Sequence, residues 1–215
     1  MDPSFWHEKW LQNDIGFHEA ETNPNLRKYF AHILPVTHAR VFVPLCGKTR
    51  DIGWLLAQGH TVVGAELSEA AIISLFADLG VAPLVSPHPV GKHYAAHGID
   101  IFVGDIFDLM PDDVGPIDIV YDRAALVALP AEVRPRYGQQ IMRLTDKAPQ
   151  LLLSFEYDQK ALNGPPFSVD LAEITKIYGS HFTITEKARQ PIAGRLKTRL
   201  HGSELQDQTT WSLQL

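Results

Sequence analysis

The chain lacks the features of a secreted, membrane-spanning or nucleic-acid-binding protein. Its 215 residues include one cysteine, Cys46, so no internal disulfide can form and a reducing compartment is expected. No apolar run approaches the 18 or so residues of a membrane span, and the first residues lack the basic and apolar regions of a signal peptide. The net charge of −6 argues against nucleic acid or an anionic membrane as partner. We therefore expect a cytoplasmic protein, and the charge says little about a small substrate.

Glycine is scarce at the one turn where a nucleotide-binding loop would need it. The segment FVPLCGKT at 42–49 contains a single glycine, Gly47, so the G-x-G-x-x-G pattern of dinucleotide sites is absent. A phosphate loop would need glycine in place of Phe42. This turn is therefore poorly suited to bind either a pyrophosphate or a triphosphate. A nucleoside without phosphates fits better, and S-adenosylmethionine is the common one.

The same region does contain the front half of a nucleotide-binding α/β unit. An apolar strand at 40–45 precedes the turn, a helix is expected at 49–58, and a second apolar strand at 61–66 ends in Glu66. Glu66 follows Gly47 by 19 residues. A carboxylate at an offset of about 20 residues is placed to bind the two hydroxyls of a ribose.

Periodicity and turn residues predict an alternating order of strands and helices. Strands are expected at 40–45, 61–66, 99–103, 117–121 and 150–155, with a final antiparallel pair at 183–188 and 209–215. Helices are expected at 3–14, 24–33, 49–58, 69–80, 132–145 and 170–178, and residues 81–98, rich in proline and glycine, are expected to form a loop. This order predicts an α/β fold with a doubly wound, mostly parallel, seven-stranded sheet, helices on both faces and an antiparallel C-terminal strand pair. That is the Rossmann-like layout of class I methyltransferases. We expect one domain over 1–215, with 1–35 as a helical cap or flap.

Several motifs in order give the chain a family resemblance. They are FVPLCGK at 42–48, GHTVVG at 59–64 with ELS at 66–68, DIFD at 105–108, DRAALVA at 122–128 and GPPF at 164–167, with Trp6, Trp10 and GFH at 16–18 near the start. Together they resemble the thiopurine S-methyltransferase family, in its bacterial form, over nearly the whole chain. The resemblance implies S-adenosylmethionine-dependent methylation of aromatic and heterocyclic thiols such as thiopurines, by a monomer. Bacterial relatives are also linked to methylation of selenium and tellurium species.

The resemblance implies cofactor contacts at Trp10, Leu45, Glu66 and Arg123. Further contacts are expected at Phe17, Gly47 and Ile106. An aromatic face favours a sulfonium cation, so Trp10 is expected in a lid, although packing on the sheet is the commoner role of tryptophan. No catalytic residue is assigned, because alignment and desolvation supply much of the rate when a thiolate attacks.

Other interpretations of these residues remain open. His88, His93 and His97 match no compact ligand spacing, so no metal is expected, and Cys46 is expected to be a buried neighbour of the turn. The Arg123 guanidinium is expected to bind the cofactor carboxylate or an anionic acceptor, and Asp122 is a weak candidate for a base. A nicotinamide oxidoreductase and a non-catalytic nucleoside-binding protein are the rival functions, and the acceptor stays undecided between thiols and selenium or tellurium species.

Overall fold

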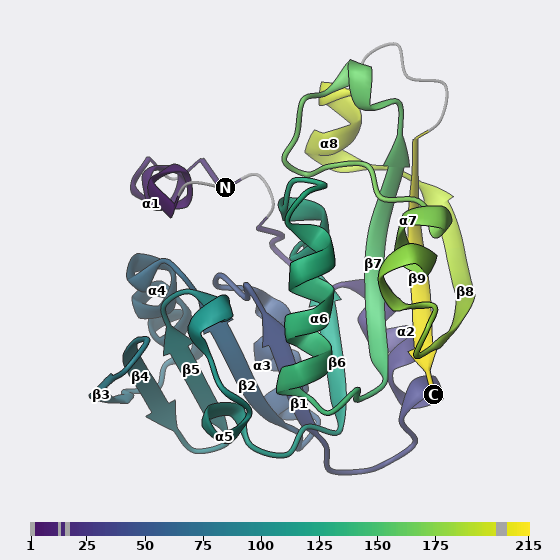
Figure 1. Cartoon of the computed structure of the whole chain (residues 1–215). Coiled ribbons are helices and arrows are strands. Elements are labelled where there is room, and N and C mark those ends of the chain that lie inside the picture. The colour runs from purple at the N-terminus through teal and green to yellow at the C-terminus, as the bar shows by residue number, and fades with distance from the viewer. Residues whose placement is uncertain (1–2, 13, 16–17, 201–205) are drawn as a thin grey trace.

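The computed structural model describes residues 3–12, 14–15, 18–200 and 206–215, and a single nine-stranded sheet organises them (Figure 1). The strand order is β3-β4-β5-β2-β1-β6-β7-β9-β8. The parallel part consists of β1 (Arg40–Pro44), β2 (Thr61–Glu66), β5 (Ile99–Val103), β6 (Ile119–Arg123) and β7 (Gln150–Tyr157). Antiparallel strands flank it on both sides, namely β3 (Leu84–His88), β4 (Gly91–Ala96), β8 (Thr183–Pro191) and β9 (Gln206–Gln214).

Helices cover both faces of this sheet because its central strands are apolar on both sides. One face packs against α2 (Pro24–Ile33), α3 (Arg50–Ala57) and α4 (Glu69–Leu79). The other packs against α5 (Pro111–Val114), α6 (Arg134–Leu144) and α7 (Leu171–Tyr178). Helices α1 (Pro3–Leu11) and α8 (Gly194–Arg199) lie beyond the carboxyl edge of the parallel strands (Figure 1). No helix in the described ranges is both long and apolar enough to cross a membrane.

The expected count of seven strands is wrong, because residues 81–98 form a hairpin rather than a loop. Strand β4 pairs antiparallel with β5, and β3 pairs with β4 at the edge of the sheet. Leu84 and Val85 of β3 are both exposed. This strand has no buried face, so its sequence does not alternate between apolar and polar residues. Pro87 is compatible with this strand because an edge strand does not need every N–H group.

Most other boundaries were predicted to within a few residues, and one difference affects the site. The strand expected at 117–121 is shifted to Ile119–Arg123, so Asp122 and Arg123 are its last residues instead of following it. Short helical segments η1 (Ile106–Asp108), η2 (Leu126–Ala128) and η3 (Gln159–Ala161), and helices α5 and α8, were not predicted. Each spans six residues or fewer, too short to show a helical period.

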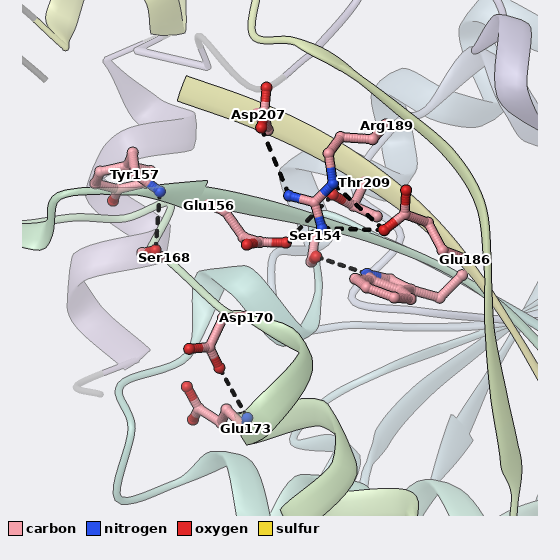
Figure 2. A network of polar contacts seen from close by, with 11 residues as sticks. Ser154, Glu156, Tyr157, Ser168, Asp170, Glu173, Glu186, Arg189, Asp207 and Thr209 are labelled. Carbon is pink, nitrogen blue, oxygen red and sulfur yellow. Dashed lines mark hydrogen bonds and ion pairs between the residues drawn. The ribbon is translucent and has the colours of Figure 1, made fainter. Parts of the chain in front are cut away.

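The C-terminal antiparallel strands are held together by a polar network on one face (Figure 2). The Arg189 guanidinium on β8 makes ion pairs with Glu156 on β7, at 2.9 Å, and with Asp207 on β9, at 3.5 Å. The Trp211 indole donates a 2.9 Å hydrogen bond to the Ser154 hydroxyl. These contacts stabilise the part of the sheet beyond β7. The candidate site lies on the parallel strands.

Candidate functional site

The turn after β1 has an unusual backbone. Leu45 has φ +45° and Gly47 has φ +51°. Residues other than glycine rarely adopt a positive φ, so the conformation of Leu45 is unusual. The Cys46 N–H donates to the Ala65 carbonyl at 3.0 Å, which fixes the turn against β2. Strained positions of this kind persist where the surroundings determine them and are concentrated at functional sites.

Glu66 ties this turn to the end of β2. Its Oε2 accepts the Gly47 N–H and its Oε1 accepts the Ser68 N–H, both at 2.8 Å. The residue is 6% exposed. Burial raises the pKa of this carboxyl, and the backbone N–H groups oppose that rise. Each oxygen keeps a second lone pair, so the carboxylate can still accept bonds from ligand hydroxyls.

The side chain of Ser68 does not cap α4. Ser68 stands at the N-cap position, but its hydroxyl makes no capping bond, and its own N–H is taken by Glu66. The end of β2 and the start of α4 are therefore organised around the carboxylate.

Arg123 ends β6, on the other side of β1, and is shielded from solvent. Its Nη2 lies 2.8 Å from Oε1 of Glu19, and its Nη1 lies 3.6 Å from Oδ2 of Asp51. The Arg123 side chain is 12% exposed and that of Asp51 is 1% exposed. Asp51 also accepts bonds from the Asn23 N–H, at 2.7 Å, and the Tyr121 hydroxyl, at 2.9 Å. This buried carboxylate therefore joins α3, β6 and the segment that leads into α2.

Trp10 reaches the turn from α1. A methyl group placed on Gly47 would lie 3.0 Å from Cζ2 of the indole, so the ring packs directly on the Gly47 backbone. Trp10 is half-buried. Phe17, expected to be a further contact, lies outside the described residues. The Ile106 side chain belongs to the core, and its carbonyl accepts a 2.8 Å bond from Gln140.

Asp122 is part of the fold rather than an open base. It is fully buried, and its two oxygens accept bonds from the Leu126 N–H, at 3.1 Å, and the Tyr137 hydroxyl, at 2.7 Å. Burial raises the pKa of Asp122 to about 6. The carboxyl links the end of β6 to η2 and α6.

Two of the three candidate histidines pair with acidic neighbours, and the third, His97, is exposed. His88 lies 3.2 Å from Asp113, and His93 lies 2.9 Å from Asp100. Over the ranges that the structure describes, no three potential metal ligands gather at one place. Cys46 is buried as expected, and burial, followed by the charge of Glu66, raises the pKa of its thiol well above the usual range. Its thiol is therefore uncharged and unreactive.

Two hollows in the described part of the chain do not include the predicted site residues. One, of about 130 Å³, lies between Lys48, Arg50 and Asp78. The other, of about 460 Å³, is lined by residues at and just before the start of α6, by Tyr157 at the end of β7, and by residues of the loop after β7 such as Phe167. Neither is lined by Leu45, Glu66 or Arg123. N-terminal residues cover part of this edge instead, since Trp10 packs on Gly47 and Glu19 pairs with Arg123.

The strand order places the two charged groups on either side of the turn. Strands β2 and β6 both neighbour β1, so Glu66 and Arg123 end strands that lie roughly 10 Å apart. A carboxylate can accept the two hydroxyls of a ribose, and a guanidinium can bind a carboxylate. The edge is therefore suited to a nucleoside with an amino-acid tail. Sequence reasoning found both groups but missed Asp51 and Glu19, which act through Arg123 and belong to no ligand motif.

Solved structures share this fold. A 1,6-didemethyltoxoflavin-N1-methyltransferase from Burkholderia thailandensis, solved with S-adenosylhomocysteine, matches with a TM-score of 0.64 at 18% identity, over 99% of this chain and 86% of that one. The magnesium protoporphyrin IX methyltransferase of Synechocystis, also solved with S-adenosylhomocysteine, matches with a TM-score of 0.61 at 15% identity, over the whole of both chains. The expected class is confirmed: this is the class I fold of S-adenosylmethionine-dependent methyltransferases.

The sequence comparisons narrow this class to a family. The model of the family described as thiopurine S-methyltransferase matches residues 1–214. A thiopurine S-methyltransferase from Xanthobacter autotrophicus is 51% identical over 95% of this chain and 96% of its own. One from Teredinibacter turnerae is 46% identical over 99% of this chain and 97% of its own. The chain belongs to the thiopurine S-methyltransferase family and is an S-adenosylmethionine-dependent methyltransferase.

Proposed function

We propose that this methyltransferase transfers the methyl group of S-adenosylmethionine to the sulfur of an aromatic or heterocyclic thiol such as a thiopurine. The observation that carries the proposal is that three acidic side chains of the site each already accept at least two hydrogen bonds. Glu66 accepts two backbone N–H groups, and Asp51 and Asp122 each accept one N–H and one tyrosine hydroxyl. An acceptor that loses its own proton near neutral pH suits such a site. Heteroaromatic thiols do so more readily than alcohols or amines.

Cationic side chains near His18, in the segment before α2, also favour an anionic acceptor. The pKa of His18 is lowered first by burial and then by the positive charges of Lys48 and Arg50, with Arg123 adding to them against the opposing effect of Asp78. A cationic side chain beside a bound thiol stabilises its thiolate form relative to the thiol. The names of the relatives in the family agree with this chemistry.

The cofactor is assigned to the edge between β2 and β6. In the proposal Glu66 accepts the ribose hydroxyls, the backbone of Leu45 and Gly47 follows the nucleoside, and Arg123 holds the amino-acid carboxylate. Phe17 and Ile106 are further proposed contacts. The chain is proposed to be a single domain over 1–215. Of the cap expected over 1–35, α2 packs on the sheet, so the proposed cap is the part before α2, with the Trp10 ring above Gly47.

The residues of the site promote this reaction by positioning the methyl donor and by keeping water away from its methyl carbon. When bound, the cofactor supplies a methyl carbon on a sulfonium, which a thiolate attacks in line as the old carbon–sulfur bond breaks. Trp10 excludes water from that carbon and offers its ring face to the cation. Arg123 fixes one end of the donor, and Glu66 fixes the ribose, so that alignment supplies much of the rate.

The substitution Arg123→Lys tests this assignment. Lysine keeps the charge but loses the planar fork, so we expect kcat/KM for a thiopurine to fall by about tenfold or more, roughly 1.4 kcal/mol of transition-state stabilisation. The dissociation constant for S-adenosylhomocysteine should rise with it. The matched control is Arg27→Lys, at an exposed arginine on α2, which should leave both constants unchanged.

The outcomes separate the candidate roles. A changed kcat/KM with an unchanged cofactor constant would assign Arg123 to the acceptor instead of the cofactor. If both constants keep wild-type values, the assignment of Arg123 is wrong. An acceptor panel run beside it, with thiopurines, thiophenols, selenite and tellurite, separates thiol methylation from methylation of selenium or tellurium species.

A further inference from the structure

The contact between Glu19 and Arg123 is made by a residue that no motif of the site contains. Glu19 lies in the segment that precedes α2, and its side chain is 51% exposed. Its Oε1 stands 2.8 Å from Nη2 of Arg123. The Glu19 carboxylate therefore pairs with Arg123, the residue to which the proposed function assigns the carboxylate of the cofactor.

The segment before α2 is fastened at two points of unequal strength. At Asn23 the backbone N–H donates to the Asp51 carboxylate, and both residues are buried. At Glu19 the fastening is an ion pair whose glutamate side chain is 51% exposed, so water screens the attraction at that end. The point at Asn23 is therefore a fixed anchor. The point at Glu19 is the one that a competing anion can displace.

Asp51 pairs with only one side of the Arg123 guanidinium, so the other side can exchange one carboxylate for another. It faces Nη1 from within the core, where it also accepts the Tyr121 hydroxyl, so that side is permanently engaged. Nη2 faces Glu19 and the N-terminal segment. Of the two carboxylates paired with Arg123, the one at Nη2 is therefore the exposed one, 51% against 1% for Asp51.

We propose that Glu19 stands in for the cofactor carboxylate on Arg123, holds the N-terminal segment over the ligand-free site, and is displaced when the cofactor binds. The inference rests on the proposed function of Arg123. It makes Glu19 an internal competitor, so that part of the binding free energy of the cofactor is spent on breaking this ion pair. Only ligands that carry a carboxylate compete with Glu19.

The test compares two nucleosides by calorimetry on the full chain. S-adenosylhomocysteine carries the carboxylate, whereas 5′-methylthioadenosine has the same nucleoside sulfide without the amino-acid tail. We expect Glu19→Gln to bind S-adenosylhomocysteine about two- to fivefold tighter than wild type and to leave 5′-methylthioadenosine unchanged. Glu19→Ala should behave in the same way. The matched control is Glu21→Gln, which removes the same charge from an exposed residue of the same segment and should match wild type for both ligands.

Three results would overturn the inference. They are unchanged or weaker binding of S-adenosylhomocysteine by Glu19→Gln, equal tightening for both nucleosides, and an equal gain from Glu21→Gln. Arg123→Gln, measured beside them, separates this failure from failure of the proposed function. If Arg123→Gln binds S-adenosylhomocysteine like wild type, Arg123 does not hold the carboxylate. If it binds that ligand weakly while Glu19→Gln shows no gain, only the competition is disproved.

Discussion

Glu66 has a structural task as well as its proposed role in binding. Its carboxylate organises two segments through the N–H groups of Gly47 and Ser68, and it is buried. From the sequence, a carboxylate at the end of a strand is expected to be dispensable for folding. The structure contradicts that expectation, because removing this side chain leaves two backbone donors without their acceptor.

The substitution Glu66→Ala should therefore lower both cofactor affinity and stability. We expect the dissociation constant for S-adenosylhomocysteine to rise by about 10- to 100-fold, and the free energy of unfolding to fall by about 1–3 kcal/mol. Calorimetry and urea denaturation measure the two effects. Asp112→Ala, at an exposed carboxylate on α5, should change neither quantity. Weaker stability with intact affinity would show that Glu66 is only structural.

Asp122 should make stability depend on pH in a defined direction. Its folded pKa of about 6 lies above the ordinary value of 3.8, so between these values the folded chain binds a proton that the unfolded chain does not. Its contribution to stability is therefore present below about pH 4 and is lost as pH rises through about 6. The size is on the order of 1–3 kcal/mol.

The substitution Asp122→Asn isolates this effect. An amide can still accept the Leu126 N–H and can donate to the Tyr137 oxygen, so the fold should persist. We expect the difference in unfolding free energy between the variant and wild type to shift in favour of the variant as pH rises from 4.5 to 7.5. Urea denaturation across that range measures it. A difference that is constant with pH would mean that the Asp122 carboxyl is not titrating there.

At the scale of elements, the packing of α6 on α7 depends on a glycine inside a helix. A methyl group on Gly138 would lie 2.2 Å from Cγ2 of Ile177, a branched and buried side chain that cannot move aside easily. In α3, by contrast, a methyl group on Gly53 would lie 3.3 Å from the flexible end of Leu79.

The two glycines should respond to alanine with opposite signs. Alanine favours a helix by about 1 kcal/mol over glycine, whereas overpacking a core costs about 1–3 kcal/mol. We expect Gly138→Ala to lower the free energy of unfolding by about 1–2 kcal/mol, and Gly53→Ala to leave it unchanged or raise it slightly. Adding Ile177→Val, which keeps Cγ2, should not rescue Gly138→Ala, whereas Ile177→Ala should restore part of the loss. A stabilised Gly138→Ala variant would contradict the packing described.

The parallel elements were predictable because their apolar runs are buried on both faces and are bounded by clear turn residues. The hairpin of β3 and β4 was not, since its edge position removes the alternation that identifies a strand. At the site, Glu66 and Arg123 could be located from their places in motifs at strand ends. Asp51 and Glu19 could not, because their partners are 72 and 104 residues away along the chain and no local pattern records such pairs.

At the scale of the whole molecule, the sheet brings distant segments to one edge. The turn after β1, the ends of β2 and β6, and the N-terminal residues Trp10 and Glu19 all meet there. Helix α1 lies at the same edge (Figure 1). The family and the fold define the methyl donor, and the engaged carboxylates of the site favour an acceptor that ionises unaided.

The most direct test is to identify the product formed from S-adenosylmethionine and 6-mercaptopurine by mass spectrometry. The donor carries a deuterated methyl group, and fragmentation locates the label in the product. We predict a labelled methyl group on the exocyclic sulfur, formed at a rate that falls by about tenfold or more in Arg123→Lys. A label on a ring nitrogen, or no labelled product from protein that binds S-adenosylhomocysteine, would contradict the assignment to thiol methylation.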